Sequence, residues 1–173
     1  MRAESIFGVC FKEGKPQMEE VVIPAGTLVS IRFLNNLSSK ESVSGETFNY
    51  QVGGNVFIDN KLVISANSAG LGEITSAKKA RILAQPGKLE LNFKAITALD
   101  GTSLSLILGE EAEKENKRLY VAIGAGILGF IILSNPVGLV FGALVPGKNV
   151  KIEEGSEMFL QVKDDTTVIA LVQ

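Results

Sequence analysis

Hydrophobic and polar residues alternate along most of the chain between Val21 and Leu108. The alternating segments are Thr27 to Leu34, Thr47 to Val52, Val56 to Ile58, Leu62 to Ile64, Lys88 to Ile96 and Ser103 to Leu108. Turn-forming residues separate them, such as Ser44-Gly45, Asp59-Asn60 and Asp100-Gly101. A period of two bounded by such breaks predicts an all-β fold, either a small antiparallel barrel or a sandwich.

One segment departs from this pattern: Leu119 to Val145 contains no charged residue. It exceeds the ~20 residues that suffice to span a bilayer as a helix, so it is a membrane candidate. It predicts either a single span kinked at Pro136 or a helical hairpin with arms Tyr120 to Leu133 and Val137 to Leu144. Basic residues on both sides favour the hairpin, because they suit two ends on the same face; they are Lys114, Lys117, Arg118, Lys148 and Lys151.

Small residues in this segment give it a packing role. In lipid, helices associate through close contact at small side chains, so we expect these positions to pack subunits or helices together. They are Ala122, Gly124, Gly126, Gly129, Pro136, Gly138 and Gly142. The alternative is a hairpin buried within a soluble oligomer, and the composition does not separate the two.

The same glycines match G-x-G-x-x-G at Gly124, Gly126 and Gly129, the spacing of a dinucleotide-binding turn. That motif needs a helix after the turn, but Pro136 would lie in its middle. It also needs an acidic residue about 20 positions on, and Glu153 comes late for that role. We therefore expect no nucleotide site.

A short turn pattern recurs along the chain. Pro24, Gly26 and Thr27 end one strand and begin the next; Val63 to Gly72 repeats this, and Gly155 with Ser156 does so again. Gly or Asn supplies the positive φ of such a turn. The third copy lies beyond the apolar segment, so the predicted layout is an N-terminal extension (1–20), a β-domain (21–108), a charged helical connector (109–118), the apolar hairpin (119–147) and closing strands (148–173).

Charged residues and composition argue against several classes of function. The connector has opposite charges at helical spacing, such as Glu110 with Lys114 and Glu113 with Lys117. Lys78, Lys79 and Arg81 form a small basic cluster that we interpret as a solvated loop, although a lipid headgroup or nucleic acid could contact it. The net charge is −2, and the chain has no histidine and one cysteine. We therefore expect no enzyme, cofactor, metal site or nucleic-acid partner.

Several motifs resemble a known family. The stretch IPAGTLVSIRFLNNLSS (23–39) is similar to the first strand pair in outer-membrane channel subunits of type IV secretion and conjugation systems. Residues 63–73, 99–104 and 152–162 resemble their later turn, hairpin and closing strand, although Ser65 and Asn67 replace the expected Pro and Gly. The resemblance implies a periplasmic β-barrel domain that assembles into a ring, with an inserted helical hairpin crossing the outer membrane. Small envelope proteins with a glycine-rich apolar hairpin look similar too.

The sequence thus predicts a non-enzymatic, self-assembling protein of the bacterial cell envelope, in the periplasm or outer membrane. Its β-domain would form a homo-oligomeric ring, and its hairpin would contact membrane lipid as a pore or an anchor. Other envelope proteins are possible partners. The N-terminus, with its short apolar run from Ile6 to Phe11, does not read as a signal peptide. The alternative is a soluble protein-binding β-domain whose apolar hairpin is buried in an oligomer interface.

Overall fold

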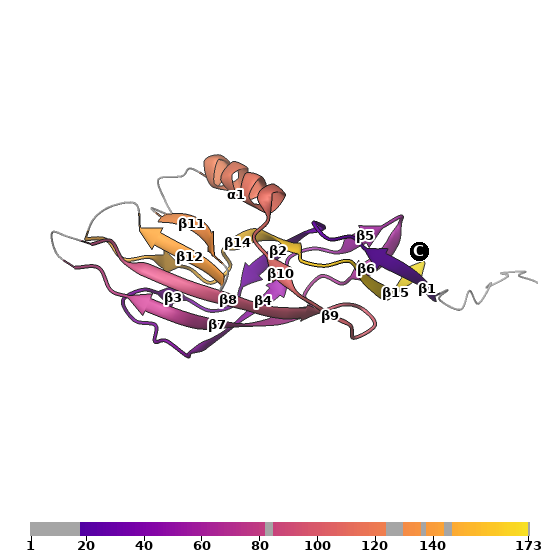
Figure 1. The fold of residues 1–173 in the computed structure, drawn as a ribbon, viewed down its shortest axis with the longest axis horizontal. Coiled ribbons are helices and arrows are strands. Elements are labelled where there is room, and N and C mark those ends of the chain that lie inside the picture. The colour runs from indigo at the N-terminus through magenta and orange to yellow at the C-terminus, as the bar shows by residue number, and fades with distance from the viewer. Residues whose placement is uncertain (1–17, 82–84, 124–129, 136–137, 144–146, 173) are drawn as a thin grey trace, which may run out of the picture.

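The structure is a computed structural model that describes residues 18–81, 85–123, 130–135, 138–143 and 147–172. Antiparallel strands dominate it, as the alternation predicts, and a single long helix lies outside them within these ranges (Figure 1). The elements are β1 (Met18–Ile23), β2 (Leu28–Phe33), β3 (Leu37–Ser38), β4 (Thr47–Val52), β5 (Val56–Ile58), β6 (Lys61–Ile64), β7 (Ala69–Lys78), β8 (Lys88–Thr97), β9 (Ser103–Leu104), β10 (Leu106–Ile107), α1 (Glu110–Ile123), β11 (Phe130–Asn135), β12 (Gly138–Ala143), β13 (Lys151–Ile152), β14 (Glu157–Val162) and β15 (Thr166–Val172).

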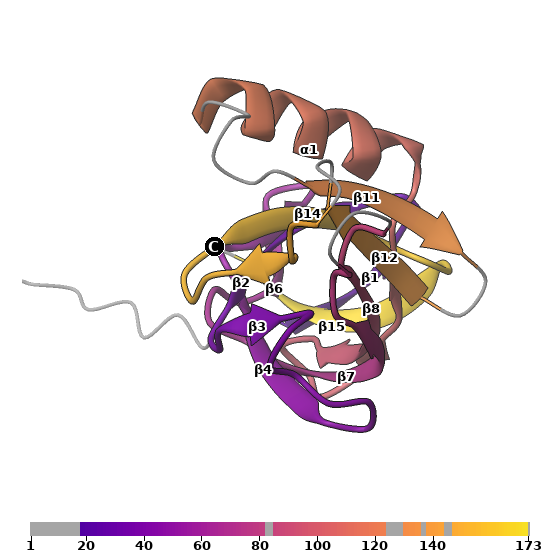
Figure 2. The ribbon, with the colours of Figure 1, turned by 90° about the vertical axis from the view of Figure 1, so that its left-hand side faces the viewer.

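The largest sheet curls into a nearly closed barrel. Its strand order is β10-β14-β2-β4-β7-β8-β12-β11, and β9 pairs with β8 off this path. Because β9 and β10 are separated only by Ser105, the segment 103–107 joins β8 to β14 and closes the part of the order from β10 to β8 into a barrel. Viewed along the long axis, these strands surround a common centre (Figure 2).

A second, four-stranded sheet has the order β1-β15-β6-β5 and continues from one end of the barrel. In it β1 pairs with β15 over six positions, from Met18 with Leu171 to Ile23 with Thr166. The sheet therefore joins the two ends of the described chain. A third, short pairing of β13 with β3 lies at the opposite end of the barrel.

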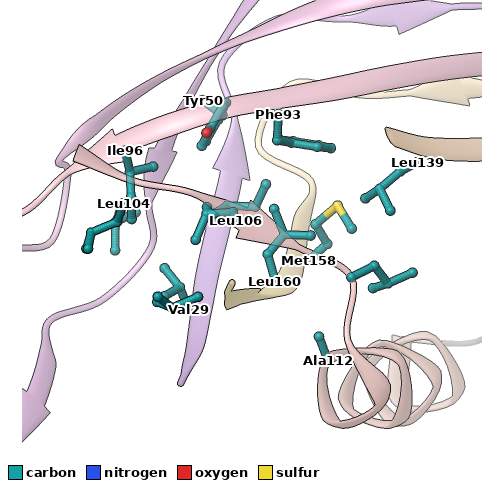
Figure 3. Close-up of a cluster of buried hydrophobic side chains, with 14 of the residues drawn as sticks. Val29, Tyr50, Phe93, Ile96, Leu104, Leu106, Ala112, Leu139, Met158 and Leu160 are labelled. Carbon is teal, nitrogen blue, oxygen red and sulfur yellow. The ribbon is translucent and has the colours of Figure 1, made fainter. Parts of the chain in front are cut away.

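The core sits inside the barrel and follows from the alternation. In β2, Val29, Ile31 and Phe33 are buried while their neighbours are more exposed. Figure 3 shows side chains from β2, β4, β8, β9, β10 and β14 converging on one cluster, with Ala112 of α1 and Leu139 of β12 at its margin.

Four aromatic rings, those of Phe33, Phe48, Tyr50 and Phe93, pack together in the part of the core beside β7. Phe48 and Tyr50 contact Phe93 edge to face, with ring centroids 5.4 and 5.2 Å apart. A Cβ on Gly72 would lie 2.1 Å from the Phe48 ring, and one on Gly70 would lie 2.3 Å from the Tyr50 ring. These two glycines therefore let the rings lie directly against the backbone of β7.

The predicted helical hairpin is wrong. The helix α1 ends at Ile123, and the apolar segment then forms the β-hairpin β11–β12, whose last pair is Asn135 with Gly138. The two arms are joined between Asn135 and Gly138, where the sequence predicted a turn, but they are strands rather than helices. The single kinked helical span is excluded for the same reason. Within the part of the chain that the structure describes, every helix is too short or too polar to cross a membrane.

Local chemistry explains why strands form here. β-branched and aromatic residues such as Ile131, Ile132 and Phe141 favour strands, and glycine costs about 1 kcal/mol inside a helix. Without β12, the backbone groups of β8 from Lys88 to Leu91 would be unpaired on this edge. β12 pairs with them. The length of the uncharged segment predicted helices, but pairing with the edge of β8 favours strands.

Candidate interaction site

The site begins at β8, which has two different neighbours on one edge. On its other edge β8 pairs with β7 from Lys88 to Ile96. On this edge its first residues pair with β12, whereas Ile96 and Thr97 pair with β9. The barrel therefore closes at one half of β8 and branches at the other half, where the hairpin extends the sheet.

The inner strand of the hairpin is part of the fold. Leu139 and Phe141 lie opposite Leu91 and Leu89, on the face of the sheet that points into the core, and both are buried. Val140 points to the other face and is also only 5% exposed. Consecutive buried residues show that β12 is covered on both faces.

The outer strand β11 forms the edge of this branch. It pairs with β12 along its whole length, from Phe130 with Ala143 to Asn135 with Gly138. Among the described residues, no strand pairs with its other side. Its sequence, FIILSN, is uncharged. An apolar strand at a sheet edge presents backbone N–H and C=O groups that another strand can pair with.

The helix α1 lies against β14 beside the hairpin (Figures 1 and 2). The buried amide of Asn116 fixes it: its Nδ2 donates to the Phe159 carbonyl at 2.8 Å, and the Phe159 N–H donates to its Oδ1 at 2.7 Å. These two bonds occupy the outward edge of β14 beyond its short pairing with β10. The side-chain amide thus does what a neighbouring strand would otherwise do.

The solvated face of α1 carries ion pairs at helical spacing. Glu113 pairs with Lys117 at 2.8 Å as the sequence predicts, whereas Lys114 pairs with Glu111 at 2.5 Å rather than with Glu110. The hydrogen bond and charge of Lys114 lower the pKa of the Glu111 carboxyl. The predicted connector is thus helical, and the helix runs on to Ile123.

Gln161 joins the start of α1 to the first turn. Its Nε2 donates to the Gly26 carbonyl at 2.8 Å, and its Oε1 accepts from the Ala112 N–H at 3.4 Å. A Cβ on Gly109 would lie 1.8 Å from that Oε1, so glycine leaves the space that Gln161 occupies. The Ala25 N–H donates to Asp165, which fixes the same turn from another side.

The repeated turn has the same geometry in each copy. Gly26, Asn67 and Gly155 have φ values of +89°, +64° and +84°. In each copy the N–H of the following Thr or Ser donates back three residues: Thr27 to Pro24, Ser68 to Ser65 and Ser156 to Glu153. Positive φ at the third position with this bond is typical of a type II turn.

The structure does not bring the first and third turns together. Since β2 and β14 are antiparallel, each turn leads into one strand and holds the end of the other. The Gly26 N–H donates to the Val162 carbonyl at 2.8 Å, and the Gly155 N–H donates to the Phe33 carbonyl at 2.8 Å. The turns therefore set the register of this strand pair from both ends.

The predicted packing residues divide into two groups. Ala122 lies in the last turn of α1, and Gly138 and Gly142 lie in β12. Gly124, Gly126, Gly129 and Pro136 lie outside the described residues, as do Cys10 and most of the predicted N-terminal extension, whose last residues belong to β1.

Sequence reasoning missed Asn116 and Gln161, the polar side chains that hold α1 in place. A signal for Asn116 is present: Ala112 and Asn116 lie four residues apart and are the uncharged positions of the otherwise fully charged stretch 110–118. That spacing marks a buried helix face. Gln161 has no comparable signal, because its partners lie far away in the sequence.

The titratable group with the largest change in pKa among the described residues is Tyr50, which is buried in the core. Burial raises the pKa of the Tyr50 phenol, whose hydroxyl donates to the Lys94 carbonyl at 2.5 Å. Within the described residues, no group of three potential ligands gathers to hold a metal ion. A shallow hollow of about 140 Å³ lies beside β3 and β13, lined by residues that include Glu41, Glu46 and Lys151.

Comparisons with known proteins find similarity at the level of structure but not of sequence family. No family model matches the chain, and no curated protein matches it. Among solved structures, the chain is similar to ComB10 of the Com type IV secretion system of Helicobacter pylori. The identity is 14% and the TM-score is 0.42, over 88% of this chain and 97% of that chain.

Proposed function

We propose that this protein is a non-enzymatic, self-assembling component of the bacterial cell envelope, in which the segment 119–147 joins neighbouring copies and contacts membrane lipid. The observation that carries the proposal is the branch of the sheet at β8. It extends the sheet beyond the barrel and ends in β11, an uncharged strand with one side unpaired among the described residues.

An apolar edge strand of this kind needs a partner. Proteins that stay monomeric protect such edges with charges, proline or bulges, and β11 carries no charge. A second copy that adds its own strand would satisfy the unpaired backbone groups through main-chain hydrogen bonds, while alternate side chains give the contact its selectivity. In a ring this contact would repeat between subunits.

The membrane part of the proposal rests on the composition of the same segment. From Leu119 to Val145 the chain has no charged residue, although charged residues are frequent on either side. An uncharged apolar run of this length is typical of a segment that enters a protein interface or contacts a membrane. The envelope location follows from the resemblance of the turn motifs to type IV channel subunits, which implies a periplasmic ring.

Ala122, the segment glycines and Pro136 are proposed to allow close packing within this assembly. Two of them, Gly138 and Gly142, lie in the strand next to the free edge. A strand with small residues lets another backbone or a bulky side chain approach closely. Pro24, Gly26, Thr27, Gly155 and Ser156 are proposed to act within the subunit, by fixing the pairing of β2 with β14.

The test of assembly uses light scattering on the purified full chain. We expect a defined oligomer for the unchanged protein and a shift to monomer for the double variant I131K/I132K, because lysine on an edge strand opposes pairing. Leu71→Lys is the control: it adds one charge at an exposed apolar position of β7, which is paired on both sides by β4 and β8.

Two outcomes would contradict the proposed assembly: a monomeric wild-type protein, or an I131K/I132K variant that remains in the wild-type oligomer. Flotation with neutral phosphatidylcholine vesicles then tests the lipid contact. If the protein floats, the apolar segment is a membrane element. If it stays at the bottom as a defined oligomer, the segment is an interface between soluble subunits, which is the alternative function.

A further inference from the structure

We propose that the end of the barrel where the hairpin joins β8 binds an anionic lipid surface through a cluster of basic residues, here called the basic end. It consists of Lys78, Lys79, Arg81, Lys88 and Lys148. The proposal deepens the membrane contact of the proposed function and rests on it. The sequence shows only Lys78, Lys79 and Arg81 as a cluster; the fold adds the other two.

Backbone contacts bring these residues together. Lys78 ends β7 and lies directly opposite Lys88, the first residue of β8. The Gly87 N–H donates to the Lys148 carbonyl at 2.8 Å, which places the third segment beside the first two. The three stretches, 78–81, 85–88 and 147–149, contain no carboxylate.

A buried scaffold holds the stretches in place. The Asn149 Oδ1 accepts from the Ala80 N–H at 2.9 Å, and the Ser39 hydroxyl donates to it at 3.3 Å. Ser39 is 2% exposed, and its hydroxyl also accepts from the Val150 N–H at 3.0 Å. A Cβ on Gly87 would lie 2.4 Å from the Ser39 Oγ, so these loops pack closely. The cations are therefore presented on an ordered surface.

Among the described residues, one of the five cations of this surface is paired with a carboxylate and the other four are not. Lys88 pairs with Glu90 at 3.2 Å. Among the described residues, no carboxylate is within ion-pair distance of Lys78, Lys79, Arg81 or Lys148, which are all exposed. Like charges directly opposite in a strand pair, as at Lys78 and Lys88, are unfavourable. An external anion would relieve that repulsion.

The segment next to the basic end favours a lipid surface over a nucleic acid as its partner. Lys88 lies opposite Gly142 in the hairpin strand β12, so the basic end directly adjoins the uncharged segment. Basic residues next to an apolar segment are typical of surfaces that lie on anionic membranes. The three basic stretches contain no aromatic residue on which a base could stack.

The experiment compares two triple variants in vesicle flotation, with vesicles of phosphatidylcholine alone and of phosphatidylcholine mixed with phosphatidylglycerol. Lys79, Arg81 and Lys148 are changed to Gln in one variant, and Lys61, Lys94 and Lys163 in the other, so both lose the same charge. A basic residue near an anionic surface strengthens binding about five-fold, so the first variant should lose on the order of a hundred-fold on the anionic vesicles. The control should stay close to wild type.

Several results would overturn the proposal. These are equal binding of the two variants to anionic vesicles, no preference of the wild type for anionic over neutral vesicles, displacement of the vesicles by inorganic phosphate at matched phosphate concentration, and tighter binding of a duplex oligonucleotide than of vesicles. All three changed residues of the first variant are exposed, and matched thermal unfolding of the two variants checks that both are folded.

The proposed function and the anionic-lipid site can be disproved independently of each other. Loss of the basic end changes only the preference for anionic vesicles, whereas I131K/I132K changes assembly in the absence of lipid. A protein that assembles and floats on neutral vesicles but shows no anionic preference would keep the proposed function and lose this inference.

Discussion

The two halves of β8 show how one strand can serve two different purposes. At its C-terminal half, Ile96 and Thr97 pair with β9, and the barrel closes within the subunit. At its N-terminal half, Lys88 to Leu91 pair with β12, and the sheet continues outward to an edge. The first half closes the barrel, whereas the second extends the sheet to β11, which is paired on one side only among the described residues. Changes on the two sides should therefore differ in what they disturb.

The largest effect is expected from Leu104→Ala. Leu104 is fully buried in β9, so its loss leaves a cavity in the closed part of the barrel and lowers the free energy of unfolding by about 2–5 kcal/mol. Leu139→Ala removes the same atoms from the branch, where Leu139 lies at the margin of the core, and should cost less. Urea unfolding of both variants measures the difference. Equal losses would mean that the hairpin is as central to folding as the barrel closure.

Gly72→Ala should have the next largest effect. The new methyl would meet the Phe48 ring at 2.1 Å, and because several rings pack together there, the ring has little room to move. Overpacking of this kind costs about 1–3 kcal/mol. Gly54→Ala is the matched control, since nothing lies within 4 Å of its added Cβ. A lowered thermal midpoint for both variants would contradict this explanation.

Asn116→Leu tests the side of the molecule that carries the branch. It leaves the Phe159 N–H and C=O without their partners, which costs about 1–3 kcal/mol. Hydrogen exchange should show faster exchange of the Phe159 amide, while the amides of β9 keep their protection. Lys117→Leu, at the neighbouring and exposed position, should leave exchange unchanged. Loss of protection in β9 would show that the two sides are not independent.

Asp100 gives the smallest expected effect, on the pH dependence of stability. Burial raises its pKa, but hydrogen bonds from the Ile169 N–H and from the Thr102 N–H and hydroxyl outweigh it, so the pKa is lowered overall. A lowered folded-state pKa contributes stability above the unfolded-state pKa, and this is lost as the pH falls through the folded-state value. Asp100→Asn should therefore flatten the acid limb of the stability curve. If the acid limb is unchanged, the loss of stability at low pH arises from other carboxyl groups.

The barrel was predictable from the sequence because its signals are local. Alternation in Leu28 to Phe33 and in Lys88 to Ile96 marks strands, and residues such as Gly26 and Gly155 mark the turns between them. The hairpin was predicted wrongly because its structure depends on a distant sheet edge, at Lys88 to Leu91, that no local pattern reveals. The bonds of Gln161 to Gly26 and Ala112 are likewise contacts between segments far apart in the chain.

The turns at Gly26 and Gly155, which hydrogen-bond to the ends of β14 and β2, also affect the order of folding. The register of β2 is fixed partly by hydrogen bonds of Phe33 with Gly155 and Ser156, more than a hundred positions later. In the same way, β1 can pair only after β15 has been made. Pairings between such distant positions form slowly, because the loop between them must close first. During synthesis, the early strands would remain open until the last ones emerge. In that interval their apolar faces would depend on a chaperone or on rapid completion of the chain to avoid aggregation.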